Sequence, residues 1–403
     1  MNRRELMTGA AGGAVFVAGT DVAAGRAEPP SLRRTTGLAP LLQPYLAKFA
    51  LPALAAAVIV KGRVAAAGVA GVRRSGTRIP VALDDRFHIG SDTKAMTALL
   101  AAMLVEGGKL GWTSTVAESF PELSGTMDAA VKPVTLEQLL SHTSGIPSDN
   151  DTHEKLLLQS YAQSGMNLDE LRYWLVKELV QQSLQSAPGE KFAYANMGYV
   201  LAGAMLERAG NASWEELVAT RIFDPLGLKS AGFGPQSSLG RVDAPLGHRM
   251  LPDGTLKPML AGPNGDNPAV LGPAGTVHLS ILDFAAWAGW NAGEGRRGPT
   301  LVRPETVRKL HTPVIDMPPR PDAKPGTPSH GRYGLGWGAI SVSFSAEPLV
   351  FHGGSNELNL AMVMLQPKND LAMVMTTNVG GTAANQALLA LAEDLYKRFG
   401  PKA

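Results

Sequence analysis

Two pairs of apolar segments, one near each end of the chain, have the length and spacing of β-hairpins. Near the N-terminus, residues 54–60 and 63–72 flank a two-residue connection that ends in glycine. Near the C-terminus, residues 359–365 and 371–377 flank a polar turn. Apolar runs joined by so short a connection are typical of paired antiparallel strands. We therefore expect one sheet built from both ends of the chain.

The middle of the chain has apolar residues at every third or fourth position, the spacing of amphipathic helices. The expected helices are 94–105, 135–140, 168–184, 197–209 and 214–222, with a further helix at 384–399 after the second hairpin. This pattern predicts an α+β fold, an antiparallel β-sheet flanked by helices, with an inserted helical subdomain at about residues 110–240. Two Gly- and Pro-rich passages, 232–275 and 313–338, are expected to be long surface loops.

Composition excludes several classes of protein. Of 403 residues, 45% are hydrophobic and 18% are charged, which excludes an intrinsically disordered chain. The 37 basic and 35 acidic residues nearly balance, and no long basic block is present, so we expect no nucleic-acid partner. The absence of cysteine excludes disulfides, a thiolate nucleophile and cysteine-ligated zinc. The histidines show no metal-ligand spacing, so we expect neither a catalytic metal nor a cofactor.

The N-terminus resembles a twin-arginine export signal. Arg3 and Arg4 precede a Gly/Ala-rich apolar stretch at residues 8–20, which is too short to span a membrane. We expect residues 1–27 to be the signal, cleaved after Ala27 or at a second site within residues 23–25. The mature domain, residues 28–403, would then be periplasmic or secreted, without stable membrane insertion. The alternative is a frayed tail whose arginine pair arises by chance.

Ser91 and Lys94 form the first candidate for chemistry, at the start of the helix predicted for 94–105. Residues three apart on a helix lie one turn apart on the same face, so the amine can reach the hydroxyl. Backbone N–H groups at a helix start favour a developing negative charge, which suits a nucleophile. The alternative is a serine helix cap followed by a solvated lysine.

Tyr194 and Asn196 form the second candidate, just before the helix predicted for 197–209. The side chains of two residues that are two positions apart in an extended chain project to the same side. A tyrosine beside a lysine can lose its proton more readily and act as a general base, and Asn196 could hold a substrate amide. The alternatives are a half-buried core ring for Tyr194 and a helix cap for Asn196.

The third candidate is the segment from His352 to Ser355, expected on the edge of the C-terminal sheet. Gly353 and Gly354 would let a substrate approach the backbone closely. The N–H of Ser355 could then be an oxyanion donor alongside that of Ser91. The α/β-hydrolases also carry a His-Gly-Gly segment, but no G-x-S-x-G elbow occurs in this chain.

In this order and at these separations, the three motifs resemble the serine β-lactamase and penicillin-binding family, in its class C-like branch of esterases and D-alanyl-D-alanine peptidases. Supporting stretches lie at residues 139–146, 224–228, 273–277 and 333–337. The resemblance covers roughly residues 40 to 398. It implies an antiparallel sheet flanked by helices, with the site in the cleft beside a helical domain.

The resemblance also implies roles for the candidate residues. Ser91 would be the acylated nucleophile, Lys94 and Tyr194 the proton-transfer pair, and Asn196 a substrate-orienting amide. The substrate would also contact His352 and the three residues that follow it. His352 occupies the position where β-lactamases usually carry lysine. Many members carry threonine or serine at the next position, where this chain has glycine.

These observations predict an exported serine hydrolase that acts through an acyl-enzyme on carboxylic esters or related small amide or peptide substrates. A protonated His352 would partly replace the missing lysine, so activity on β-lactams would rise at low pH. The first alternative is a D-alanyl-D-alanine peptidase or β-lactamase, and the second is a non-catalytic penicillin-binding or scaffold protein. His142 is expected to be a hydrogen-bonded structural residue.

Overall fold

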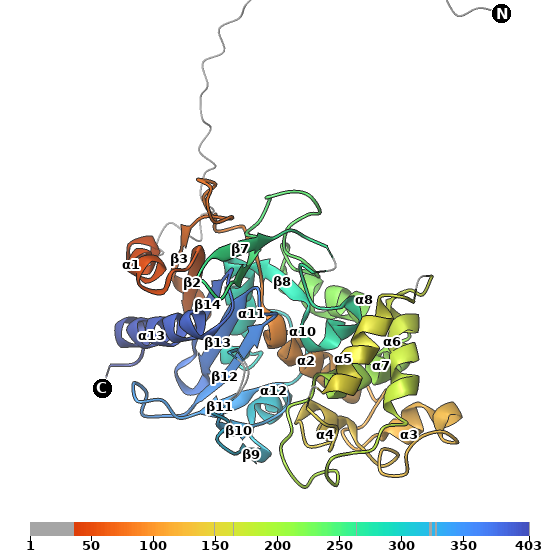
Figure 1. Cartoon of the computed structure of the whole chain (residues 1–403). Coiled ribbons are helices and arrows are strands. Elements are labelled where there is room, and N and C mark those ends of the chain that lie inside the picture. Colours follow the sequence, from red (N-terminus) through yellow and green to blue (C-terminus); the bar gives the residue numbers. More distant parts are fainter. Residues whose placement is uncertain are drawn as a thin grey trace, which may run out of the picture. The chain divides into compact units, whose positions relative to one another are not determined.

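The computed structural model describes residues 36–402, except for 149, 164, 263, 322–324, 327 and 328. The predicted export signal, residues 1–27, lies outside the described residues. Within the described part, a sheet domain and a set of helices pack into one compact unit (Figure 1). Among the described helices, none is both long and apolar enough to cross a bilayer.

The described residues form a nine-stranded, largely antiparallel sheet that joins the two ends of the chain. In spatial order its strands are β1 (Thr36–Gly37), β3 (Arg63–Gly71), β2 (Ala53–Val60), β14 (Leu371–Thr377), β13 (Leu360–Gln366), β12 (Leu349–Ser355), β11 (Gly338–Ile340), β10 (Gly331–Tyr333) and β9 (Ile315–Met317). Both predicted hairpins are confirmed, as β2–β3 and β13–β14. The pairing of β2 with β14 joins the two hairpins into one sheet, from Val60 opposite Leu371 to Leu54 opposite Thr377.

Both faces of the central strands are buried, which explains why these strands read as continuous apolar runs. Successive side chains of a strand point to opposite faces. In β2, Leu54, Ala56 and Val58 pack in the core beneath α1 and α13. Ala55 and Ala57 instead join the core beneath α2 and α11. The sheet is therefore the middle layer of three, and the predicted fold class is confirmed.

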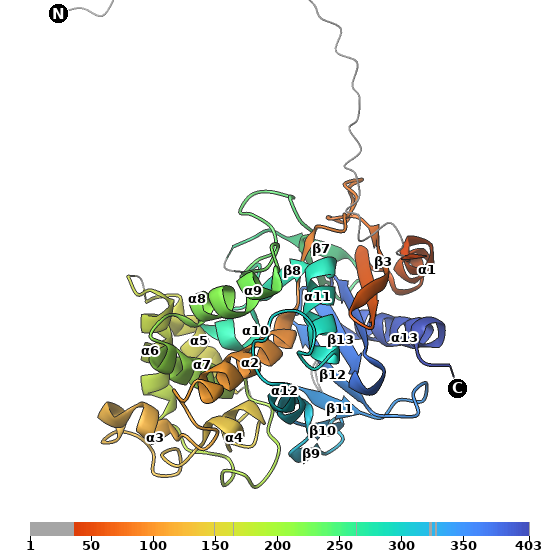
Figure 2. The same ribbon diagram turned by 180° about the vertical axis from the view of Figure 1, so that it is seen from behind.

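The helices of the outer layers come from distant parts of the chain (Figure 2). They are α1 (Ala39–Phe49) and α13 (Thr382–Phe399) on one face, and α2 (Thr93–Glu106) and α11 (Ile281–Ala292) on the other, with α12 (Pro304–His311) beside α2. A small sheet of β4 (Arg86–His88), β8 (Val277–Ser280) and β5 (Gly232–Phe233) adjoins α2. Through β4, this small sheet leads the chain into the turn that carries Ser91.

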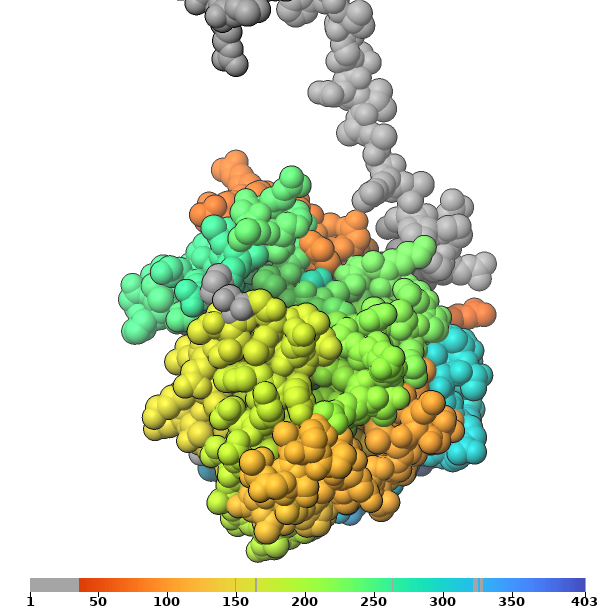
Figure 3. Space-filling model, turned by 90° about the vertical axis from the view of Figure 1, so that its right-hand side faces the viewer, coloured from red at the N-terminus to blue at the C-terminus, as the bar shows by residue number. Residues whose placement is uncertain are grey.

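Residues 110–240, predicted as a helical subdomain, contain most of the remaining helices. These are α3 (Val116–Ser119), α4 (Leu136–Leu140), α5 (Asp151–Ser160), α6 (Leu168–Leu179), α7 (Asn196–Gly210), α8 (Trp214–Val218) and α9 (Asp224–Leu226). Figure 3 views this side, with residues of α5 and α6 in yellow beside the light green of α8. α7 is the central helix, because α3, α4, α6 and α8 all pack against it.

Some predicted helix ends and loops are wrong. The helix predicted for 168–184 ends at Leu179, where the side-chain amides of Gln181 and Gln182 donate to the carbonyls of Lys177 and Glu178. After Val218, the predicted helix 214–222 continues as a π-helix. The predicted loops hold a hairpin, β6 (Gly247–Met250) and β7 (Leu256–Met259), the helix α10 (Gly272–Gly275), and β9 to β11. Strands of three or four residues are too short to show a hydrophobic period.

Candidate active site

The turn that carries Ser91 depends on a glycine. β4 ends at His88, and Gly90 takes φ +51°, a left-handed conformation that glycine adopts without strain. Ser91 then lies in the short 3₁₀ turn η2 (Gly90–Asp92), which continues into α2. The residue that caps α2 is Asp92, whose side chain makes no capping bond. Ser91 is therefore not a helix cap.

Lys94 lies at the centre of the site and is fully buried, so the alternative of a solvated lysine is wrong. Its Nζ donates to three neutral oxygens: Ser91 Oγ at 2.9 Å, Asn196 Oδ1 at 2.8 Å and the Ala274 carbonyl at 2.7 Å. Oγ and Nζ are thus within direct proton-transfer distance. The three hydrogen bonds of Nζ connect α2, α7 and α10 at one atom.

The acceptors of Lys94 are themselves held in place. Thr97 Oγ1 donates to the Pro273 carbonyl at 2.7 Å, which fixes α10 against α2. Asn196 is the first residue of α7, and the residue before it caps that helix without a side-chain bond. Asn196 is therefore not a helix cap, and its side chain binds Lys94 instead. Because Asn196 is only partly buried, its amide can also face a substrate.

Aromatic rings surround the amine of Lys94. Nζ lies 4.9 Å from the ring centroid of Tyr194 and 5.4 Å from that of Tyr199. Both rings are buried, and His142 packs on them with centroid distances of 4.3 and 5.1 Å. His142 Nδ1 accepts from the N–H of Ala195 at 3.1 Å, so its predicted structural role is confirmed. Burial, aided by the charge of Lys94, lowers the pKa of His142 well below its usual value.

The strand β12 brings its glycines directly against the Ser91 turn. A Cβ added to Gly354 would lie 2.5 Å from the Ser91 nitrogen, so only glycine permits this approach. A Cβ on Gly90 would likewise collide with the Ser355 nitrogen. The N–H groups of Ser91 and Ser355 are therefore on adjoining backbone segments, as an oxyanion hole requires.

The edge position predicted for this segment is only partly right. β12 lies between β13 and β11. However, β11 pairs only with Leu349–Phe351, so β11 leaves His352–Ser355 unpaired on the side away from β13. Along this stretch the backbone of Gly326 packs against Gly353 and Ser355. Gly353 thus offers the site only backbone atoms.

The structure contradicts a substrate-binding role for the His352 side chain. The ring is fully buried, with Nδ1 2.8 Å from the Gly353 carbonyl and Nε2 2.9 Å from the Tyr333 hydroxyl. Burial and the charge of Lys94 lower the pKa of His352 to about 3. A neutral, enclosed imidazole cannot replace a lysine, so the prediction that His352 raises β-lactam activity at low pH is wrong.

A buried polar network borders the Ser91–Ser355 junction and escaped the sequence prediction. His88 Nε2 lies 2.9 Å from Asp266 Oδ1, and Asn356 Nδ2 donates to the same oxygen at 2.8 Å. His88 Nδ1 accepts from the Gly90 N–H at 3.0 Å. The loop that carries Asp266 is therefore attached to both segments that supply the oxyanion donors.

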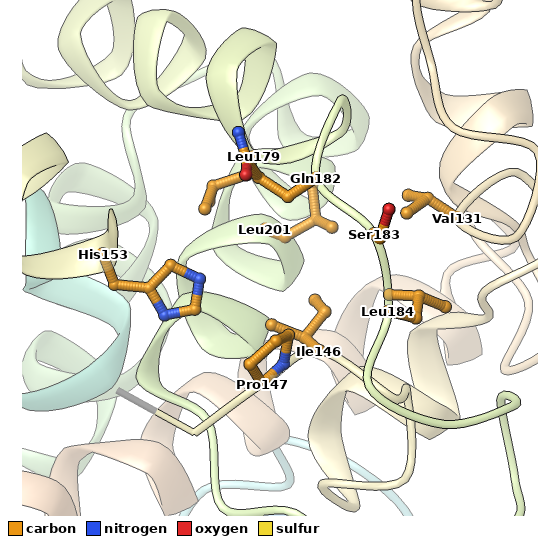
Figure 4. A pocket seen from close by; sticks show the side chains of 9 residues that line it. All are labelled: Val131, Ile146, Pro147, His153, Leu179, Gln182, Ser183, Leu184 and Leu201. Carbon is orange, nitrogen blue, oxygen red and sulfur yellow. The ribbon is translucent and has the colours of Figure 1, made fainter. Parts of the chain in front are cut away.

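A separate cavity in the helical part is too small for a substrate. It measures about 10 Å³, close to the smallest space that holds one water molecule, and His153 borders it (Figure 4). The rest of its lining is Val131, Ile146, Pro147, Leu179, Gln182, Ser183, Leu184 and Leu201. None of the candidate catalytic residues lines it.

The predicted residues thus divide into two groups. Ser91, Lys94 and Asn196 are joined by hydrogen bonds, and the Tyr194 ring packs beside them. The backbone of Gly354 and Ser355 adjoins them, whereas the His352 ring is enclosed elsewhere. Sequence reasoning missed the Ala274 carbonyl, although its Pro-Ala-Gly stretch was noted, and it missed the partners of His352, which are Asp92 and Tyr333.

Known proteins resemble the chain in sequence and in structure. The "Penicillin-binding protein 4" of Amycolatopsis lactamdurans is 26% identical, over 83% of this chain and 82% of that protein. The "Protein flp" of Staphylococcus aureus is 22% identical over 84% of this chain, which spans 62% of the length of that relative. The octameric penicillin-binding protein homologue from Pyrococcus abyssi superimposes with a TM-score of 0.69 at 25% identity, over 88% of this chain and 76% of that one.

A family model assigns most of the chain to one family. The model described as "Beta-lactamase" matches residues 38–397, which includes all the candidate site residues. The match spans the strands from β2 to β14 and the helices between them, and of the described sheet it leaves out β1. The chain therefore belongs to the β-lactamase family.

Proposed function

We propose that this protein is an exported hydrolase that forms an acyl-enzyme on Ser91 and acts on carboxylic esters that carry no carboxylate of their own. The observation that carries the proposal is the buried contact of 2.9 Å between Lys94 Nζ and Ser91 Oγ. A serine hydroxyl becomes a nucleophile when a base accepts its proton.

The proposed reaction has two steps. To act as a base, the Lys94–Tyr194 pair must first lack one proton, as an amine beside a phenol or an ammonium beside a phenolate. Ser91 Oγ then attacks the acyl carbon while its proton passes to this pair, and the N–H groups of Ser91 and Ser355 stabilise the oxyanion. The bond to the alcohol then breaks, and the leaving oxygen takes the proton. In the second step, water attacks the ester of Ser91 and releases the carboxylic acid.

The preference for esters rests on β12. The position where β-lactamases usually carry lysine holds the enclosed, neutral His352, and the next residue has no hydroxyl. A charge-assisted hydrogen bond to a substrate carboxylate is worth about 1.5 to 3 kcal/mol. We therefore expect kcat/KM for a short uncharged ester to exceed that for a chromogenic cephalosporin by at least roughly 10- to 100-fold.

The test combines labelling with a substrate panel. Intact-mass measurement after incubation with a fluorophosphonate should show one adduct, which Ser91→Ala abolishes. Turnover is then compared on the ester, the cephalosporin and a D-Ala-D-Ala peptide. Preferred turnover of the peptide or the cephalosporin would favour the peptidase or β-lactamase alternative, which the name of the Amycolatopsis relative also suggests. Labelling without any turnover would favour a non-catalytic binding protein.

Export is tested separately. Replacing Arg3 and Arg4 by lysine keeps the charge but removes the arginine pair that defines the signal, so the full-length chain should stay in the cytoplasm. The matched control replaces Arg33 and Arg34 by lysine, and this variant should still be exported. Equal export of both variants would contradict the proposed signal.

A further inference from the structure

A carboxyl group follows the nucleophile directly and is fully buried. Among the described residues, neither oxygen of Asp92 has a hydrogen-bond partner. The imidazole of His352 is close by, with Nδ1 3.4 Å from Asp92 Oδ1. Burial of a charge is costly, so burial favours the neutral form of both residues, and for Asp92 this effect outweighs the opposing charge of Lys94.

The contacts of His352 determine where its own proton lies. The Gly353 carbonyl, 2.8 Å from Nδ1, is only an acceptor, so Nδ1 carries the hydrogen. Nε2 then accepts from the Tyr333 hydroxyl at 2.9 Å. Burial raises the pKa of Tyr333 well above its usual value, which keeps that proton on the oxygen.

Asp92 completes the arrangement as a neutral acid. Burial raises the pKa of Asp92 well above its usual value, while the charge of Lys94 acts in the opposite direction. The other groups around the pair are Tyr333 on β10, the low-pKa His142 and the buried Tyr194. None of these three supplies a positive charge at neutral pH.

The position of the pair gives it a consequence for catalysis. Asp92 follows Ser91 in the η2 turn, and His352 lies three residues before Ser355 on β12. Elsewhere in this contact the two segments meet through glycine backbone, since a Cβ on Gly354 or Gly90 would collide with the opposite segment. Glycines set how closely the segments approach but provide no side chain that fixes their alignment.

We propose that Asp92 and His352 form a buried positioning pair that keeps the η2 turn, which carries Ser91, aligned with β12, which carries Ser355. The inference rests on the proposed acyl-enzyme function. In this proposal His352 positions a neighbouring segment of the protein and does not bind the substrate. Neither residue touches the reacting atoms, so both act on the rate through Ser91 and Ser355.

Removing the contact should slow acylation without weakening substrate binding. In Asp92→Leu we expect the rate of fluorophosphonate labelling and kcat for an ester to fall about 10- to 100-fold, as for a misplacement of about 1 Å, with KM changed less than about threefold. Asp92→Asn should recover most of the rate, because a neutral amide resembles a protonated carboxyl. Adding His352→Leu to Asp92→Leu should cost little more, since the contact is already lost.

Asp85→Leu is the matched control. It removes another buried carboxyl, one that pairs with Arg73 outside the site. This variant should lose stability but keep the labelling rate at temperatures where it is folded. Melting curves of all variants distinguish a loss of the folded state from a loss of the alignment between the Ser91 turn and β12.

Nitrogen-15 NMR of the histidine rings in the intact protein provides a readout that needs no variant to be active. His352, assigned through the spectrum of His352→Gln, should be the neutral Nδ1–H form from pH 5 to 8. A doubly protonated His352 at neutral pH, or an Asp92→Leu variant labelled at the wild-type rate, would overturn the positioning pair. Failure of the wild-type protein to be labelled would contradict the proposed function instead, whatever form His352 takes.

Discussion

Among the residues that the structure describes, two cations are fully buried, and their surroundings differ. Arg172 on α6 lies between two carboxylates: its Nη2 is 2.9 Å from Glu207 and 2.7 Å from Glu215, and Nη1 donates to the Val270 carbonyl at 3.4 Å. Lys94 on α2 donates to a hydroxyl, an amide and a carbonyl. Both side chains have zero exposed surface.

The difference separates a structural cation, Arg172, from the proposed catalytic one, Lys94. Glu207 and Glu215 pair with Arg172, and guanidinium does not lose its proton in proteins, so Arg172 itself stays a cation. Lys94 instead donates to the hydroxyl of Ser91 at 2.9 Å, a distance across which a proton can pass between Nζ and Oγ. Removing the first cation should therefore damage the fold, and removing the second should damage the reaction.

The largest effect is expected from Lys94→Met. Loss of a positioned general base should lower kcat/KM for an ester by roughly 10²- to 10⁴-fold. The free energy of unfolding should change by less than about 1 kcal/mol or increase, because an apolar side chain replaces a buried charge. Ester kinetics and urea denaturation measure the two quantities. A strongly destabilised but active variant would reverse the assignment.

Arg172→Met should show the opposite result. It leaves Glu207 and Glu215 buried without their cation, and breaking such a cluster typically costs about 3 to 5 kcal/mol. Urea denaturation should show this loss. The fraction of protein that remains folded should label with the fluorophosphonate at the wild-type rate, since Arg172 lies on α6, which carries none of the candidate site residues. Normal stability would show that the cluster is dispensable.

Features that depend on residues close together in the sequence could be predicted, and features that depend on distant residues could not. The β2–β3 and β13–β14 hairpins were predictable because their apolar runs are long, whereas β9 to β11, each three residues long, leave no period to detect. The S-x-x-K spacing places Ser91 and Lys94 together within one helical turn, so their contact is local. Residues that come into contact from distant parts of the chain have no fixed spacing in the sequence by which the contact could be predicted.

Two features of the site illustrate that limit. A backbone carbonyl such as that of Ala274 has no residue signature, since any residue supplies one. The histidine of β12 was misassigned because its environment depends on Asp92 and Tyr333, which only the fold brings to it. Similarly, Arg172 gives no sign in the sequence that it is buried between carboxylates.

A smaller effect concerns the pH dependence of the Arg172 cluster. Burial raises the pKa of Glu207 from 4.5 to about 7. A carboxyl with a raised pKa in the folded state stabilises the fold below the unfolded-state value and loses that contribution as the pH rises through the folded-state value. Stability should therefore decline between about pH 4.5 and 8, by up to about 3 kcal/mol from this group.

Glu207→Gln isolates that contribution. Its side-chain oxygen can still accept from the N–H of Trp214 and from Arg172, as Glu207 Oε1 does at 2.9 and 3.0 Å. Urea denaturation at several pH values should show a flatter decline for the variant than for the wild type. Parallel curves for the two proteins would mean that Glu207 does not titrate in this range.

The smallest effect is expected where two substitutions act on one proton-transfer unit. Tyr194→Phe alone should lower ester turnover by about 10²-fold, because the ring beside Lys94 would lose its ionisable hydroxyl. In the Lys94→Met background, the same substitution should lower turnover by less than about threefold further, since the unit is already inactive. Tyr199→Phe is the matched control, because the Tyr199 ring also borders Lys94 but its hydroxyl donates to the Leu140 carbonyl at 2.6 Å. Fully multiplicative losses for Tyr194 and Lys94, or near-normal turnover in Tyr194→Phe, would show that Tyr194 is a packing residue and that the proton leaves Ser91 through Lys94 without it.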